Sequence, residues 1–486
     1  MPINSNADHD LASDTGPRLI MAIAGLVFVL LMAFGWLMLG SQGGYITLEP
    51  RLFYQLLTAH GIGMVGTAGI AGVAIMWYFL RRYVPVNAKV LWATVGLFLI
   101  GVVLILFSIF IMGFAAAWTF LYPLPAKSAS VWEPASAIVN LIGLLLVGVA
   151  FLLVYLDVGR ALISTYGGLG RALGWPMLFG NSQEAPPPTV VAATAVTIAN
   201  TIGLVVGAAV IAISLVNLWL PQFDIDPLLA KNMIYFFGHV FINATIYMAV
   251  IAVYEIVPQY TNRPWKANRV FLAAWSATLL MVMAVYPHHL FQDTVMPPWA
   301  LVVGQVLSYL SGVPVLAVTT LGLLGYLYGA GVRWDLPLSL LVLGVFGWAA
   351  GAIPAVIDGM IVVNKIMHNT LWVPGHFHYY LLLGMVAMSW GFMAWLTRAG
   401  DSEEFSLLDR ILFASYVVGG IGLTTMFLYA GSKSVPRRWA VHLPEWGFAG
   451  KIGAPMALLV IAGALWFLVR YVMRLQAQQR PLPPAE

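Results

Sequence analysis

The sequence predicts an all-α integral membrane protein, a bundle of twelve transmembrane helices with both termini in the cytoplasm. Of its 486 residues, 61% are hydrophobic and only 9% are charged, whereas charged residues make up about a quarter of a soluble domain. The hydrophobic residues gather into twelve runs, each long enough to cross a hydrocarbon core of about 30 Å as a helix. Helices are expected throughout because an open sheet edge leaves backbone groups unpaired in lipid.

The spans follow one another without a repeat or a linker, so residues 18–476 are expected to form one domain. Residues 1–17 are polar and predict a disordered cytoplasmic tail, and they lack the basic start of a signal peptide. Residues 477–486 predict a second cytoplasmic tail. In chain order, helices are expected near residues 19–39, 54–80, 90–118, 134–156, 190–219, 230–258, 268–287, 299–328, 337–364, 371–397, 408–431 and 453–475.

The basic residues predict the orientation of the bundle, because cytoplasmic loops carry an excess of lysine and arginine. Most of the 23 basic residues lie in the two tails and in the loops after every second span. This distribution predicts that both termini are cytoplasmic. One outer loop departs from it with a cluster of basic residues, namely Lys433, Arg437, Arg438 and Lys451.

The composition also excludes several classes of protein. The formal net charge of +4 is too small to indicate a nucleic-acid partner, and the expected surroundings are membrane lipid. The chain has no cysteine, which excludes disulfides, iron–sulfur clusters and a covalently attached heme c within it. A copper centre built on thiolates would therefore lie in a partner subunit.

Histidines form the main candidate site. Of the nine in the chain, seven lie in or at the ends of spans, where an ionisable group is usually functional. The predicted topology brings six of these to a similar depth in the outer half of the membrane: His60, His239, His288, His289, His376 and His378. Six imidazoles at one depth favour a site for heme iron, copper or non-heme iron over six separate packing roles.

The spacing of these histidines indicates more than one cofactor. His376 and His378 are two residues apart, so on a helix they point about 200° away from each other and serve different cofactors. The adjacent pair His288 and His289 cannot share one face of a regular helix. At a helix end, where the backbone unwinds, both can turn toward a single metal with His239 as the third ligand.

These histidines occur in motifs that resemble subunit I of the heme–copper oxidoreductases. The motifs are LTAHG at 57–61, GH at 238–239, HH at 288–289, HNTLWVPGHFH at 368–378 and VPRR at 435–438. The resemblance covers nearly the whole chain, and the sequences of the HNTLWVPGHFH and HH motifs are most similar to those of the B-type branch. It implies two hemes, one low-spin and one high-spin, and one non-heme metal that is copper or iron.

The resemblance also implies a role for each residue. His60 and His378 are expected to be the axial ligands of the low-spin heme, and His376 the proximal ligand of the high-spin heme. The non-heme metal is expected to be bound by His239, His288 and His289. Heme propionates are expected to pair with Arg437 and Arg438, and the region of propionates and bridging waters is expected to include His368 and Asn369.

One departure from the family pattern bears on the reaction. Oxygen-reducing B-type members have a tyrosine linked to the first metal-binding histidine, four residues further on, where this chain has Asn243. The C-type position holds Val282, and neither Tyr247 nor Tyr286 has a helical position that would replace it. Cleaving O₂ takes four electrons, of which heme iron and copper supply three and tyrosine the fourth. Coupling two NO takes only two electrons, so no tyrosine is needed.

Two further features concern protons. Tyr254 matches a tyrosine of the B-type proton path, but other hydroxyl positions of that path hold apolar residues, among them Val250 and Val315. This predicts a broken cytoplasmic route, as expected for an enzyme that does not pump. Asp358 lies ten residues before His368, about 15 Å along a helix, and is a candidate proton relay.

Asn243 is expected to hydrogen-bond bound NO or to offer its side-chain oxygen to the non-heme metal.

The sequence therefore predicts the catalytic subunit of a membrane respiratory nitric oxide reductase. Two alternatives stay open: a B-type terminal cytochrome c oxidase that reduces O₂ to water and, more distantly, a non-redox transporter whose histidines relay protons. The resemblance implies a subunit II-like partner with a soluble copper or heme c domain, fed by cytochrome c or a small copper protein. It also implies the prokaryotic cytoplasmic (inner) membrane, with the active site in its outer, periplasmic-side half.

Overall fold

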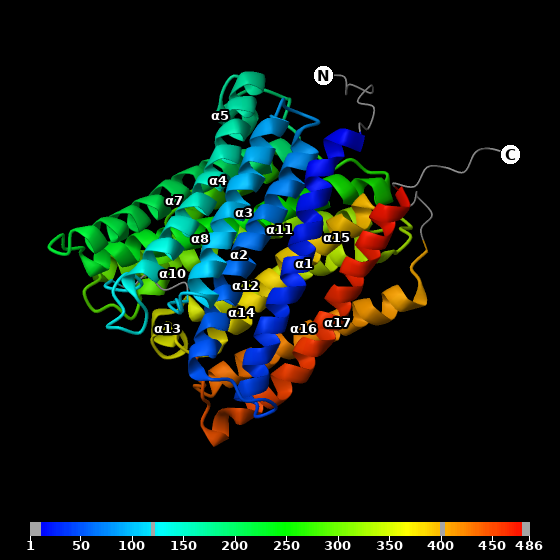
Figure 1. Cartoon of the computed structure of the whole chain (residues 1–486). Coiled ribbons are helices and arrows are strands. Elements are labelled where there is room, and N and C mark those ends of the chain that lie inside the picture. The colour runs from blue at the N-terminus through cyan, green and yellow to red at the C-terminus, as the bar shows by residue number, and fades with distance from the viewer. Residues whose placement is uncertain (1–10, 118–121, 399–403, 479–486) are drawn as a thin grey trace.

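The fold was determined as a computed structural model that describes residues 11–117, 122–398 and 404–478. In these ranges twelve helical segments are long and apolar enough to cross a membrane, which confirms the predicted fold class. They pack side by side in one bundle (Figure 1). The segments are α1 (Leu11–Gln42), α2 (Pro50–Leu80), α3 (Ala88–Phe110), α4 (Pro134–Tyr166), α7 (Pro188–Trp219), α8 (Pro227–Thr261), α9 with η1 (Arg269–Val282, Tyr286–Leu290), α10 with α11 (Pro298–Leu310, Val313–Leu327), α12 (Leu336–Asp358), α14 with η2 and α15 (Trp372–Tyr380, Leu381–Val386, Ala387–Leu396), α16 (Leu407–Ser432), and η3 with α17 (Pro444–Trp446, Gly447–Gln478).

Three short helices lie in the connections: α5 (Leu169–Ala172), α6 (Trp175–Leu178) and α13 (Ile361–Met367). Most spans begin with proline at one of the first two helical positions, where the missing N–H costs no hydrogen bond. Side-chain oxygens of Asn87, Asp226, Asn268, Asp335 and Ser406 accept hydrogen bonds from the first turn of the helix that follows each of them. These caps end the polar loops and start the apolar spans at defined residues.

Helix α1 begins earlier than the sequence indicates. It starts at Leu11, so residues 11–17, which were expected to belong to the disordered tail, extend the first span; residues 1–10 and 479–486 lie outside the described residues. The extension is held because the buried Asp14 carboxylate forms an ion pair with Arg81 at the end of α2. At the other end of the chain, the Tyr471 hydroxyl donates to the Arg18 carbonyl oxygen at 2.9 Å.

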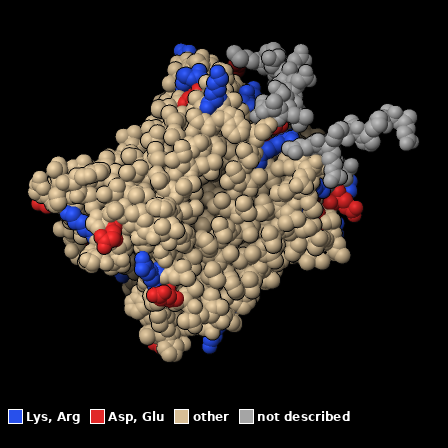
Figure 2. Space-filling model, in the orientation of Figure 1, with Lys and Arg blue, Asp and Glu red and all other residues tan. Residues whose placement is uncertain are grey.

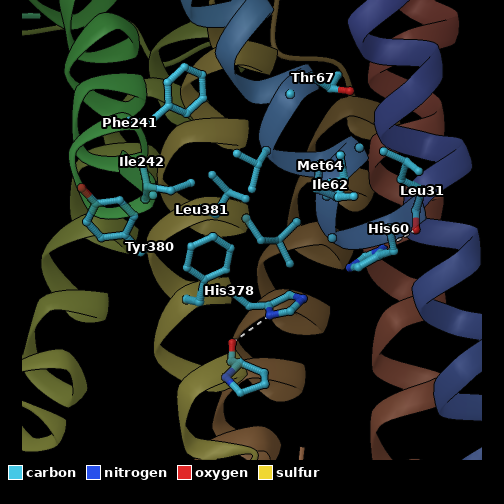
Figure 3. A pocket seen from close by; sticks show the side chains of 18 of the residues that line it. Leu31, His60, Ile62, Met64, Thr67, Phe241, Ile242, His378, Tyr380 and Leu381 are labelled. Carbon is cyan, nitrogen blue, oxygen red and sulfur yellow. Dashed lines mark hydrogen bonds between the residues drawn. The ribbon is translucent and has the colours of Figure 1, made fainter. Parts of the chain in front are cut away.

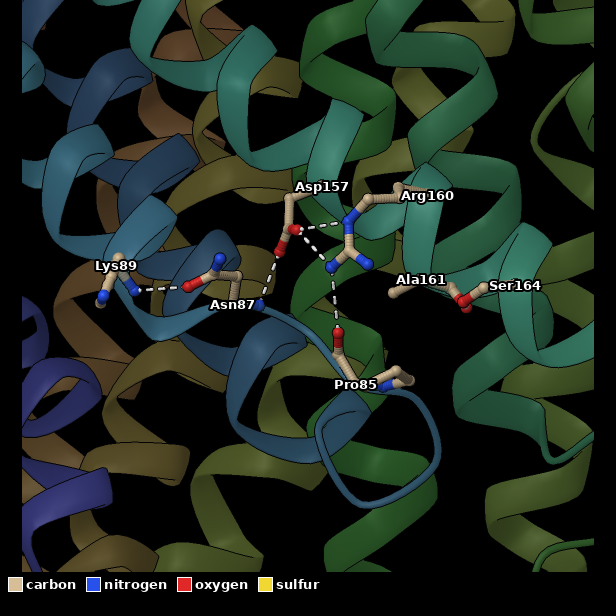
Figure 4. Close-up of polar contacts among 7 residues, drawn as sticks. All are labelled: Pro85, Asn87, Lys89, Asp157, Arg160, Ala161 and Ser164. Carbon is tan, nitrogen blue, oxygen red and sulfur yellow. Dashed lines mark hydrogen bonds and ion pairs between the residues drawn. The ribbon is translucent and has the colours of Figure 1, made fainter.

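Helix α4 continues ten residues past its predicted end, to Tyr166. The Asp157 carboxylate explains the extension, because it accepts hydrogen bonds from Arg160, 2.7 Å away, and from the Asn87 backbone N–H at 2.7 Å. Arg160 also donates to the Pro85 carbonyl oxygen at 3.1 Å (Figure 4). These contacts keep the polar end of α4 helical and fasten the loop between α2 and α3 to it.

Three spans depart from the continuous helices that were expected. The ninth, expected over 337–364, ends at Asp358 and is followed by the separate helix α13. The seventh ends at Val282 and resumes as the 3₁₀-helix η1, which carries the HH pair. The eighth is interrupted at Ser311 and Gly312, between α10 and α11. In both of these spans a proline lies in the first two residues of the second helix, Pro287 in η1 and Pro314 in α11. Proline has no backbone N–H, so the helical hydrogen-bond ladder loses a donor there. The unwound backbone at the HH pair agrees with the sequence analysis.

Burial separates inner spans from outer ones. The most apolar windows of α8 and of the α14–α15 span are 83% buried and that of α2 is 78% buried, whereas the α10–α11 window is only 11% buried. The three inner spans carry His60, His239, His376 and His378, so the candidate site lies in the middle of the bundle. Charged side chains gather toward the ends of the molecule and leave an uncharged band between them (Figure 2), as expected for a multi-pass membrane protein.

Candidate functional site

A cavity of about 860 Å³ lies inside the bundle and connects the predicted site residues. All seven histidines in or at the ends of spans line it, together with Asn243, Asp358, Arg437 and Arg438. Asn369 and Tyr254 do not line it. The histidines that the sequence analysis places at one depth thus line one cavity, although they lie up to 318 positions apart in the chain.

His60 and His378 face each other across one part of the cavity (Figure 3). Their ring centroids are 6.3 Å apart and their planes are 15° from parallel. The Nδ1 atoms lie 2.7 Å from the carbonyl oxygens of Leu31 and Pro374, respectively. Since a carbonyl only accepts, each Nδ1 carries the proton and each Nε2 keeps its lone pair. A metal about 2 Å from a nitrogen of each ring requires centroids roughly 6 Å apart, so the pair fits axial ligation of a heme.

His239, His288 and His289 form a second cluster. One nitrogen of each ring lies within 4.8 Å of the others, which is a spacing that a single metal ion can bridge. His288 and His289 reach the cluster from η1, with ring centroids 4.3 Å apart. His239 approaches from α8, with its centroid 4.8 Å from that of His288. The three-histidine arrangement fits a non-heme metal such as copper or iron.

Neighbouring side chains orient the rings of His288 and His289. The Ser308 hydroxyl lies 2.6 Å from the Gly304 carbonyl oxygen, to which it donates, and 2.9 Å from His288 Nδ1. Because its single hydrogen is used on the carbonyl, the hydroxyl accepts from His288 Nδ1–H, and Nε2 is left as the ligand atom. His289 Nδ1 lies 3.1 Å from His368 Nε2. The sequence analysis missed Ser308, which no motif distinguishes.

Asn243 connects His239 to a tyrosine that the sequence analysis also missed. Asn243 Nδ2 lies 2.9 Å from His239 Nδ1 and 2.9 Å from the His239 carbonyl oxygen. Its Oδ1 accepts a hydrogen bond of 2.9 Å from the Tyr380 hydroxyl. Tyr380 lies in the tenth span, whereas the tyrosines of the family pattern lie in the sixth and seventh spans. A tyrosine four residues after His376 was the available signal.

His376 lies on α14 and lines the same cavity as the two clusters. Its Nδ1 is buried without a hydrogen-bond partner among the described residues. Across the cavity, a Cβ added to Gly238, the neighbour of His239, would meet no atom within 4 Å. Open space beside the three-histidine cluster, and an unpaired imidazole nitrogen in the same cavity, fit a second heme with His376 as its only protein ligand.

Two residues of the basic loop, Arg437 and Arg438, line the same cavity. Burial, and then the neighbouring charge of Arg438, lower the pKa of Arg437 to about 10. Two partly buried guanidinium groups on adjacent residues fit a bound anion such as a propionate, which would offset their repulsion. The Arg437 backbone N–H donates to the Asn369 carbonyl oxygen at 3.0 Å, and Asn369 Nδ2 donates to Gln292 at 2.8 Å. Asn369 thus joins the basic loop to the region of the HH pair without lining the cavity.

The structure gives the three remaining candidates different surroundings. These are His368, Asp358 and Tyr254. Burial, and then the Arg437 charge, keep the pKa of His368 well below its usual range, so its ring is neutral beside His289. Asp358 is 5% exposed, and its Oδ1 has no hydrogen-bond partner among the described residues. Tyr254 is away from the cavity and shares a 2.7 Å hydrogen bond with Thr319 on α11.

Comparison with known proteins identifies the family. The family model described as cytochrome c and quinol oxidase polypeptide I matches residues 18–469. Cytochrome c oxidase subunit 1 of Thermus thermophilus is 26% identical over 262 residues, which are 49% of this chain and 46% of that protein, so the match spans about half of the relative's length. Cytochrome c oxidase polypeptide 1 of Halobacterium salinarum is 24% identical over 448 residues, 86% of this chain and 70% of that protein.

A solved structure supports the fold. A heme–copper terminal oxidase dimer studied by cryo-EM superposes with a TM-score of 0.80, covering 97% of this chain and 85% of that chain at 21% identity. The family match spans nearly all of the chain, and it supports the prediction of a heme-containing membrane oxidoreductase over that of a non-redox transporter. The chain therefore belongs to the cytochrome c and quinol oxidase polypeptide I family and is a subunit I of the heme-containing heme–copper oxidoreductases.

Proposed function

We propose that this protein is the catalytic subunit of a respiratory nitric oxide reductase, which converts 2 NO, two electrons and two protons to N₂O and water. The observation that carries the proposal is Asn243 at the position of the family's redox tyrosine. An amide cannot supply the fourth electron that O₂ cleavage needs, whereas NO coupling needs two. The proposal places the reaction between His376 and the cluster of His239, His288 and His289.

The protein's own residues would have three tasks in this reaction. His376 would hold a high-spin heme, and His239, His288 and His289 would hold a non-heme metal. When bound, these two groups would supply one electron each to the two NO molecules. His60 and His378 would hold the low-spin heme that receives electrons, and Arg437 with Arg438 would neutralise propionates. Asp358 is the candidate that delivers protons from the outer side, because it is buried in the cavity wall and its Oδ1 has no hydrogen-bond partner in the described part of the chain.

A terminal oxidase is the second candidate, and two observations favour it. The relatives from Thermus and Halobacterium are named cytochrome c oxidases. In addition, the Tyr380 hydroxyl lies one hydrogen bond from Asn243, so a phenol is present near the cluster although it comes from another helix. If Tyr380 could be oxidised during turnover, O₂ reduction would have its fourth electron.

The remaining proposals concern electron supply and location. We infer that electrons enter from a subunit II-like partner with a soluble copper or heme c domain, because this chain has no cysteine. Cytochrome c or a small copper protein would be the donor. The membrane would be the prokaryotic cytoplasmic membrane, with the basic loop and the active site in its periplasmic-side half.

The deciding experiment measures both substrates on one preparation. The purified, reduced complex is given O₂ and NO in parallel, with uptake followed by electrodes and N₂O by gas chromatography. Fast NO uptake that yields one N₂O per two NO, with slow O₂ uptake, is expected. Fast O₂ uptake to water would refute the reductase and establish the oxidase. The His239→Ala variant, which lacks one ligand of the cluster, serves as the inactive control for both gases.

A further inference from the structure

A continuous chain of tyrosine and tryptophan rings leads from the reaction site to the end of the bundle where α8 and α11 end. In order, the rings are Tyr380 on α14, Trp348 on α12, Tyr247 on α8, Trp275 on α9, Tyr254 on α8, Trp265 in the connection after α8, and Tyr326 on α11. The centroids of successive rings are 6.5, 6.1, 5.4, 6.4, 4.9 and 4.6 Å apart. Each step is therefore a direct ring contact.

The inner end of this aromatic chain lies at the reaction site. Tyr380 lines the cavity that contains the histidine clusters, and Figure 3 shows it on the α8 side, away from His60. Its hydroxyl donates to Asn243 Oδ1 at 2.9 Å, and the same amide contacts His239. A single side chain thus separates the first ring from the three-histidine cluster.

The other end of the aromatic chain lies near the surface. Trp265 is 8% exposed, and the half-buried Tyr326 ring stacks on it with the planes 27° from parallel. At an exposed position, the Tyr326 hydroxyl donates to the Pro264 carbonyl oxygen at 3.0 Å and accepts from the Lys266 N–H at 3.1 Å. The orientation predicted from the basic residues places this end on the cytoplasmic side, where thiols are kept reduced.

Rings of these two kinds can pass electrons one at a time. Tyrosine and tryptophan are the sulfur-free side chains that lose an electron most readily, whereas phenylalanine is much harder to oxidise. Because electron transfer slows steeply with distance, several short steps are faster than one long step. Continuity depends on Trp275, because without it Tyr247 and Tyr254 are separated by about 10 Å along α8.

We propose that the aromatic chain supplies an electron from the surface to the reaction site when a peroxide reacts there and the electron donor is exhausted. Hydrogen peroxide becomes two water molecules when its O–O bond breaks and it takes up two electrons and two protons. One electron comes from the cofactors bound at the site, and the protons come from solvent. The other electron comes from Tyr380, which is then reduced by the next ring, and so on outward.

The net change falls on the last ring of the aromatic chain. Tyr326 loses one electron and its hydroxyl proton, the proton goes to water, and the six inner rings end unchanged. A thiol restores Tyr326 by giving up one hydrogen atom, and two such thiols end as a disulfide. The oxidising equivalent thus leaves the site without damaging its histidines. This activity goes beyond the proposed function, because it requires the bound cofactors but not NO or O₂ as the substrate.

The test determines which side chain carries the oxidation after peroxide has reacted. The purified, oxidised complex with its hemes is mixed with hydrogen peroxide and a nitroso spin trap, and the adducts are located by peptide mass spectrometry. We expect an adduct on Tyr326 and little on Tyr328, which is 85% exposed but lies outside the aromatic chain. More adduct on Tyr328 than on Tyr326 would mean that peroxide attacks from solution, and would overturn the proposal.

Trp275→Phe interrupts the aromatic chain, and Trp390→Phe is the matched control. Both indoles are fully buried, but Trp390 lies outside the aromatic chain and packs against α1 and α17. We expect Trp275→Phe to lose most of the adduct on Tyr326 and to gain adduct on Tyr247, on the reaction-site side of the break. Trp390→Phe should label like the unchanged protein. Equal labelling of Tyr326 in the two variants would refute the path.

A second variant keeps the test decisive if Trp275→Phe lacks a Soret band and so fails to assemble. Trp265→Phe removes the ring between Tyr254 and Tyr326 and lies in a connection outside the spans. Loss of the adduct on Tyr326 is expected there too, and full labelling would overturn the proposal. None of these readouts uses NO, so a failure of the nitric oxide assay stays distinguishable from a failure of the aromatic chain.

Discussion

The contact between Ser308 and His288 leads to a quantitative prediction. Replacing Ser308 with alanine removes the acceptor for His288 Nδ1–H, which lies 2.9 Å from the hydroxyl oxygen. The ring is enclosed by η1 and α10, so the N–H is left buried and unpaired. That costs about 1–3 kcal/mol, and since each 1.4 kcal/mol is about tenfold in affinity, non-heme metal binding should weaken roughly 5- to 150-fold.

The assay is a competition between the protein and a chelator of known affinity, with heme absorbance as the measure of assembled protein. Ser308→Thr keeps a hydroxyl and should restore most of the affinity. Ser415→Ala is the matched control, because that hydroxyl bonds the Leu459 carbonyl oxygen on the lipid side of α16. Equal metal affinity in Ser308→Ala and the unchanged protein would refute the assignment of Nδ1 as the protonated nitrogen, and with it the role of Nε2 as ligand.

Three other predictions follow from the same geometry. His378→Ala should remove the low-spin heme and leave the high-spin heme. Pyridine hemochrome analysis would then find about half the heme content of the unchanged protein, and full heme content would contradict the pairing of His378 with His60. Asn243→Ala should lower turnover of the preferred gas about 10- to 100-fold with unchanged heme content, measured with the same electrodes, and unchanged turnover would mean that the amide only packs. Asp409→Ala should destabilise the bundle by about 3–5 kcal/mol, because it leaves the Arg470 charge buried without its partner. Asp409 and Arg470 are 4% and 5% exposed and form an ion pair at 3.2 Å. A thermal unfolding midpoint that does not fall would contradict this prediction.

The sequence predicted the spans and the histidines because both depend on local or periodic features. Hydrophobic runs are visible without a structure, and six histidines at one predicted depth required only the count of crossings. The contacts around those histidines were not predictable, because Ser308 meets His288 and Tyr380 meets Asn243 only through tertiary packing. The spacing of four residues places Tyr380 on the same helical face as His376 but does not identify its partner. The end of α4 was also misjudged, since Asp157 and Arg160 look like the start of a loop until their hydrogen bonds to the neighbouring connection are known.

The distance along the chain between the two facing imidazoles also bears on biogenesis. His60 and His378 belong to the second and tenth spans, and at roughly 5–20 residues per second a ribosome takes on the order of tens of seconds to make the chain between them. During that time His60 Nδ1 can already be bonded, because its acceptor is the Leu31 carbonyl oxygen in the first span. The first two spans can therefore stay in the membrane before a cofactor binds. Insertion of the low-spin heme becomes a late step, which follows synthesis of the tenth span.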